Sequence, residues 1–187
     1  HPLFDPPESL QSKSFPWADG APKIAVLPGS RAGEVRANGP TMLRACVELK
    51  KQHPGLRAVV AAVDQAGSDW VRSVGEQTGG WPGGVEIAVG QTDAVLEWSD
   101  VALVVSGTAT LQTVVRRRPM VVMYNVGRLT WWLLGPWLIK TRTFSLPNLI
   151  AEASGWGRVV PELVPHFGAV DPVAREMDRL IRDPRAR

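Results

Sequence analysis

The chain has 187 residues, 44% of them hydrophobic and 21% charged, which is typical of one globular domain with its own core. Its 21 basic and 18 acidic residues give a formal net charge of +3, and the basic residues form no stripe, which argues against a nucleic-acid-binding protein. A single cysteine excludes an internal disulfide, and three scattered histidines do not suggest a metal site.

The chain opens with a segment rich in proline and serine, residues 1–22, that is interpreted as a lead-in or linker. The domain proper is expected to cover residues 23–187. No methionine and no signal peptide begin the chain, and its last residues are equally abrupt. We therefore expect a piece of a longer protein.

Short apolar runs then alternate with helical patterns. Pro40 is expected in the first turn of the first helix, and Cys46 inside that helix as a small buried side chain. Because strands alternate with helices at least five times, the sequence predicts an α/β fold with a doubly wound parallel sheet. The strands are expected at residues 23–27, 56–63, 85–89, 101–105 and 120–124, and the helices at 40–52, 68–77, 93–98, 108–115, 129–139 and 173–181.

The first predicted strand is followed by a loop that contains Gly29, Ser30 and Arg31. Glycine lets a backbone approach a ligand closely, and the planar guanidinium of arginine suits phosphate oxygens. The loop lacks the second glycine and the Lys-Ser/Thr pair of a Walker loop. A phosphate contact and a tight turn with a surface arginine both remain open.

The fourth predicted strand is followed by Ser106, Gly107, Thr108, Ala109 and Thr110, where a helix is expected to begin. Backbone N–H groups at a helix start, together with two hydroxyls, can hold a diphosphate. The alternative is an ordinary helix cap made by Ser106 or Thr108.

Two later segments place a polar side chain after a proline: Asn148 in SLPN and Glu162 in PELV. Asn148 could contact a sugar or phosphate, or cap the next helix. Glu162 could bind both hydroxyls of a ribose, or lie in a first helical turn. Since ligands of such sheets bind beyond the carboxyl ends of the strands, the segments together predict a pocket for an anionic, nucleotide-type ligand.

A tryptophan-rich run lies at residues 129–139 and contains Trp131, Trp132 and Trp137. At 11 residues it is shorter than the ~20 residues that span a bilayer. Tryptophan favours the headgroup region of a membrane, so the run could be an interfacial anchor. It could equally be a core helix interrupted by its Gly-Pro pair.

The ordered motifs resemble those of the lipid-A-disaccharide synthases, bacterial glycosyltransferases of lipid A assembly. The matching segments are HPL at the start, then LPGSR, SGTAT, PMVVMY, LT, SLPNLI and PELV, so they cover nearly the whole chain. The resemblance implies a Rossmann-like domain that forms one half of a GT-B glycosyltransferase. It also implies that this half binds the UDP-sugar, is shortened at its carboxyl end, and lacks its amino-terminal partner domain.

The resemblance also implies a reaction. UDP-2,3-diacylglucosamine condenses with 2,3-diacylglucosamine 1-phosphate, giving lipid A disaccharide 1-phosphate and UDP, without a metal or other cofactor. Both substrates are lipids, so the implied location is cytoplasmic, peripheral to the inner membrane of a Gram-negative-type bacterium. The alternatives are another UDP-sugar GT-B enzyme, such as a UDP-N-acetylglucosamine transferase or 2-epimerase, or a non-catalytic nucleotide- or membrane-binding module.

The family pattern suggests roles for individual residues. Arg31 and Asn148 would be catalytic, Glu162 would bind the ribose, and the general base would lie in the absent domain. Gln112 and Pro165 depart from the residues usual in the family. The remaining implied substrate contacts are Gly29, Ser30, Ser106, Gly107, Thr108, Ala109 and Thr110, and the implied membrane or acyl-chain contacts are Trp131, Trp132 and Trp137.

Overall fold

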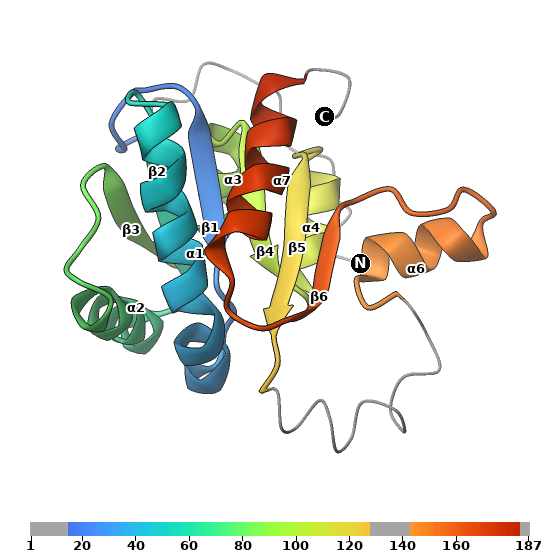
Figure 1. Ribbon diagram of the computed structural model, residues 1–187, viewed down its shortest axis with the longest axis horizontal. Helices are drawn as coiled ribbons and strands as arrows, with labels where there is room; N and C mark the ends of the chain where they lie inside the picture. The colour runs from blue at the N-terminus through green and yellow to red at the C-terminus, as the bar shows by residue number, and fades with distance from the viewer. Residues whose placement is uncertain (1–14, 128–142, 184–187) are drawn as a thin grey trace.

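The structure is a computed structural model that describes residues 15–127 and 143–183 (Figure 1). In this part of the chain, six strands form one parallel sheet in the order β3-β2-β1-β4-β5-β6. This strand order is that of a dinucleotide-type Rossmann fold. The predicted α/β class and doubly wound parallel sheet are therefore confirmed.

The strands are β1 (Lys23–Leu27), β2 (Arg57–Ala62), β3 (Val85–Val89), β4 (Val101–Val105), β5 (Met120–Asn125) and β6 (Glu162–His166). The helices are α1 (Ala32–Gln52), α2 (Gln65–Gln77), α3 (Thr92–Trp98), α4 (Ala109–Val115), α6 (Leu146–Ala153) and α7 (Val170–Arg182).

Both faces of the sheet are covered, which explains why its central strands β1 and β4 are apolar apart from Lys23 at the start of β1. Ile24 and Val26 of β1 point into a core shared with α1, α2 and α7. Ala25 and Leu27 point into a second core, which includes α3. Helices α1 and α7 lie on the near face in Figure 1, and α3 and α4 lie behind the sheet.

Three expectations about the elements were wrong. The first helix begins at Ala32 instead of residue 40, and Pro40 lies inside it. Glu162, for which a first helical turn was one alternative, opens the edge strand β6; Pro165 fits there because an edge strand leaves one side unpaired. The SLPN segment opens an additional helix, α6, with Pro147 in its first turn.

Part of the expected linker packs against the domain. Trp17 is buried in the second core, where its ring meets Trp98 edge-on at 5.7 Å and stacks with Phe15 at 5.9 Å. The boundary between residues 22 and 23 stays a prediction. The tryptophan-rich run at residues 129–139 lies outside the described residues, and no helix within them is both long and apolar enough to cross a bilayer.

Cys46 faces the first core, as expected. It is 1% exposed, and burial raises the pKa of its thiol to about 12. The thiol is therefore protonated at neutral pH, which suits a packing role.

Helix α7 is fastened to the end of α1 through Asp178. Its Oδ1 lies 2.7 Å from His53 Nε2 and accepts a hydrogen bond from Arg182 Nε at 2.8 Å. Burial alone would raise the pKa of the Asp178 carboxyl, but the hydrogen bonds and charges of Arg182 and His53 hold it below its ordinary value of 3.8. A carboxyl with a lowered folded-state pKa stabilises the fold above the unfolded pKa and loses this effect as the pH falls.

Replacing Asp178 by asparagine is expected to lower the free energy of unfolding by about 1 kcal/mol at pH 7, because charge-assisted hydrogen bonds become neutral ones. The difference from the wild type should shrink as the pH falls below 3.8, where the unfolded carboxyl is already protonated. Thermal melts of both proteins between pH 3 and 7 measure it. Glu76→Gln, on the exposed side of α2, is the control. If the stability difference between wild type and Asp178→Asn does not change with pH, the lowered pKa of Asp178 is contradicted.

Candidate functional site

The carboxyl ends of β1 and β4 frame a hollow of about 360 Å³. These two strands are neighbours, and the strand order reverses between them: β2 and β3 lie beyond β1, while β5 and β6 lie beyond β4. The chain leaves β1 toward one face of the sheet and β4 toward the other. The two loops therefore part and leave a crevice, which is the usual ligand site of this fold.

The loop after β1 is folded around the carboxylate of Glu34. Glu34 Oε2 accepts hydrogen bonds from Ser30 N (3.0 Å) and Arg31 N (3.4 Å), and Glu34 Oε1 lies 3.1 Å from Arg31 Nη1. Gly29 is required here because its φ is +109° and a Cβ would lie 2.5 Å from Glu34 Oε2. A carboxylate thus occupies the start of α1, where the helix dipole and free N–H groups favour an anion.

The loop after β4 is held by side-chain hydroxyls. Thr110, fully buried, donates from Oγ1 to the carbonyl oxygen of Gly107 at 2.6 Å. Ser106 Oγ donates to the carbonyl oxygen of Phe144 at 3.0 Å. Thr108 is the N-cap residue of α4, as the alternative expected, but its side chain makes no cap hydrogen bond.

The hollow unites the first two predicted motifs. Among the described residues that line it, only Arg31 and Glu34 carry a charge, and they neutralise each other. Arg31 is nevertheless 83% exposed at its side chain, so its guanidinium is accessible to a ligand. The predicted residues that line the hollow are Gly29, Ser30, Arg31, Ser106, Gly107, Thr108 and Ala109.

Three polar lining residues had no predicted role: Glu34, Thr92 and Gln112. Glu34 could have been found, because a glutamate three residues after a helix cap is a capping-box signal. Thr92 could not, since only the placement of α3 beside β1 and β2 brings the start of that helix to the crevice.

Asn148 and Glu162 form a separate cluster next to the loop that follows β4. Glu162 Oε2 accepts hydrogen bonds from Asn148 Nδ2 (2.8 Å) and Ser145 Oγ (2.9 Å), and Oε1 accepts one from Phe144 N. Asn148 is fully buried, and its amide also binds the backbone of Val160 in both directions. Neither residue lines the hollow. Their hydrogen bonds fix the position of residues 144–148, and the Phe144 carbonyl oxygen in this segment accepts the hydrogen bond from Ser106 Oγ.

The Glu162 carboxylate retains some capacity for a ligand. A carboxylate offers about four lone-pair sites, and groups among the described residues fill three of them. Within the described residues, no group of three His, Cys, Asp or Glu side chains could hold a metal ion. The roles suggested for Arg31, Asn148, Glu162 and the two loops stay predictions.

Comparisons with known proteins agree on one family. The family model described as lipid-A-disaccharide synthetase matches residues 1–178. A lipid-A-disaccharide synthase of Myxococcus xanthus is 38% identical over 160 residues, which is 86% of this chain and 40% of that protein. One of Pseudomonas savastanoi pv. phaseolicola is 36% identical over 191 residues, covering all of this chain and 48% of that protein. The chain thus spans less than half the length of these curated relatives.

Solved structures share the fold at low sequence identity. A Staphylococcus aureus TarM mutant, solved with fondaparinux, alpha-GlcNAc-glycerol and UDP, has a TM-score of 0.53 at 8% identity, covering 96% of this chain and 32% of its own. The trehalose-6-phosphate synthase OtsA has a TM-score of 0.50 at 14% identity, covering 86% of this chain and 36% of its own. Both neighbours are GT-B glycosyltransferases, so the fold is that of one GT-B half.

Proposed function

The chain belongs to the lipid-A-disaccharide synthetase family, and from this membership we propose that it forms the UDP-sugar-binding half of a glycosyltransferase of lipid A synthesis. The whole enzyme would join UDP-2,3-diacylglucosamine to 2,3-diacylglucosamine 1-phosphate and release UDP. Membership disfavours the alternatives of another UDP-sugar enzyme or a non-catalytic module.

One observation carries the assignment of the donor site: two motifs 75 residues apart, at Gly29–Arg31 and Ser106–Ala109, line one hollow at the reversal point of the sheet. The UDP diphosphate would lie there, between the two loops. Arg31 would pair with phosphate oxygens and stabilise the negative charge that grows on the leaving UDP. Glycine at positions 29 and 107 would allow the close approach.

Asn148 and Glu162 would act from behind this pocket. Their hydrogen bonds order residues 144–148, and the remaining lone pair of Glu162 is available to a ribose hydroxyl. A catalytic contact through Asn148 would require its buried amide to give up a protein partner for a substrate atom. Its more direct contribution would be to fix the segment that supports the loop after β4.

The other functions that the reaction needs are proposed for parts of the enzyme outside the described residues. The acceptor-binding domain and the general base would lie in an amino-terminal domain. Trp131, Trp132 and Trp137 are proposed to meet acyl chains or the membrane surface. The enzyme would work at the cytoplasmic side of an inner membrane.

Calorimetric titration with UDP tests the donor site. Arg31→Ala and Glu162→Ala are each expected to weaken UDP binding, Arg31→Ala by about tenfold, since a hydrogen bond to a charged group contributes about 1.5–3 kcal/mol. Arg44→Ala, an exposed arginine on the same helix, should leave the affinity unchanged. Absence of binding to the folded chain, or equal losses in the Arg31 and Arg44 variants, would contradict the proposed site.

A further inference from the structure

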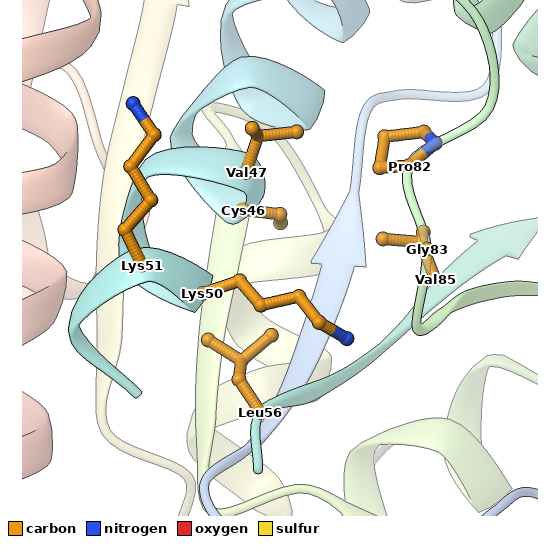
Figure 2. A pocket seen from close by; sticks show the side chains of 8 residues that line it. All are labelled: Cys46, Val47, Lys50, Lys51, Leu56, Pro82, Gly83 and Val85. Atoms are coloured by element: carbon orange, nitrogen blue, oxygen red, sulfur yellow. The ribbon is translucent and has the colours of Figure 1, made fainter. Parts of the chain in front are cut away.

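A second hollow, of about 290 Å³, lies at the opposite edge of the sheet (Figure 2). It runs between the last turns of α1 and the loop before β3. Leu56 precedes β2 and Val85 begins β3, so this hollow lies at the amino ends of the strands. It is therefore distinct from the proposed donor site, which lies at their carboxyl ends.

Apart from Lys50 and Lys51, the side chains that line this hollow are apolar. Cys46, Leu56 and Val85 form buried parts of its lining. Val47, which also lines it, is 43% exposed. Apolar side chains left in water beside a hollow favour an apolar ligand group.

Two cations lie beside Gly84, next to this hollow: Lys50, which lines it, and Arg57. Lys50 crosses it toward residues 83–85, whereas Lys51 points away (Figure 2). A Cβ on Gly84 would collide with Lys50 Nζ and would lie 3.1 Å from Arg57 Nη1, so both nitrogens flank Gly84. Lys51, in contrast, pairs with Glu48 at 2.6 Å.

No carboxylate neutralises this cation pair within residues 15–127 and 143–183. The half-buried Lys50 ammonium has neither an ion pair nor a hydrogen bond there, and Arg57 Nε donates only to the carbonyl oxygen of Asp19, at 3.4 Å. Two like charges held together and partly removed from water repel each other. An anion placed between them removes that cost.

We propose that this hollow binds an anion that carries an apolar chain. Its phosphate or carboxylate headgroup lies between Lys50 and Arg57, and its chain lies over Cys46, Leu56 and Val85. The inference rests on geometry and charge at this edge alone and does not depend on the proposed donor site.

Dodecyl phosphate below its micellar concentration is the probe, titrated into the 187-residue chain with and without added UDP. Lys50→Ala is expected to weaken its binding by about tenfold, as loss of a charge-assisted contact predicts. Lys51→Ala, with the same change of charge one residue away, should alter the affinity less than about twofold. Val47→Asp should also weaken binding by placing a like charge beside the ligand, and inorganic phosphate should bind far more weakly than the alkyl phosphate.

Several results overturn the proposal. Equal losses in Lys50→Ala and Lys51→Ala mean diffuse attraction to a basic surface. Dodecyl phosphate that is displaced by UDP binds at the other edge of the sheet. Inorganic phosphate that binds as well as the alkyl phosphate removes the role of the apolar lining, and no binding of dodecyl phosphate removes the site.

Discussion

Replacing Asn148 by aspartate is expected to lower the melting temperature by roughly 10 °C, which corresponds to about 4 kcal/mol for a chain of this size. The Asn148 amide is fully buried and donates to Glu162 Oε2 at 2.8 Å. An aspartate there would put two carboxylates in contact, with no donor between them. Asn148 Oδ1 also accepts from Val159 N and Val160 N, and the aspartate would keep those bonds. The loss therefore reports the two bonds that Asn148 Nδ2 donates, to Glu162 Oε2 and to the carbonyl oxygen of Val160 at 3.0 Å.

Acid should rescue this variant. Aspartate next to Glu162 binds a shared proton more tightly in the folded state, so the missing stability returns at low pH and is lost as the pH rises. Melts of wild type and Asn148→Asp at pH 4 and pH 7.5 measure the effect. Gln77→Glu, the same chemical change on an exposed helix end, should shift stability by no more than about 0.5 kcal/mol. An unchanged melting temperature for Asn148→Asp would favour the direct catalytic role that the family pattern suggests.

Much of the sheet could be predicted because its strands are buried on both faces. Residues 101–105 are all apolar and all buried in β4, and the loops that follow β1 and β4 were correctly placed at one edge. Parallel topology itself brings distant motifs to a single crevice. That part of the site needs only the order of strands and helices.

The predictions that were wrong or missing concern features that depend on contacts between residues far apart in the sequence. Pro40 is a good signal for a helix start, but the capping contacts of Glu34 begin α1 eight residues earlier. Strand β6 contains Pro165 and has a mixed sequence, so only its pairing with β5 identifies it. The contact between Asn148 and Glu162 likewise appears only when α6 and β6 are placed.

Glu34→Gln is expected to strengthen UDP binding by about tenfold. In the proposed donor site the Glu34 carboxylate takes the place at the start of α1 that suits a phosphate, and it holds Arg31 Nη1 at 3.1 Å. Two negative charges about 4 Å apart near a protein surface repel by roughly 1–4 kcal/mol, and 1.4 kcal/mol is tenfold in affinity. Glutamine removes the charge and releases Arg31, while its amide oxygen can still accept the hydrogen bond from Ser30 N.

Uridine, which lacks phosphates, separates this competition from a loss of loop structure. Glu34→Gln should leave uridine binding unchanged, and its gain for UDP should become smaller when Arg31→Ala is added, because the freed guanidinium supplies one part of the gain and the lost repulsion supplies the other. Glu48→Gln, which frees Lys51 further along the same helix, is the matched control and should change neither affinity. A variant that binds both UDP and uridine more weakly would mean that Glu34 acts only by holding the loop after β1, because competition with a phosphate cannot affect a ligand that has none.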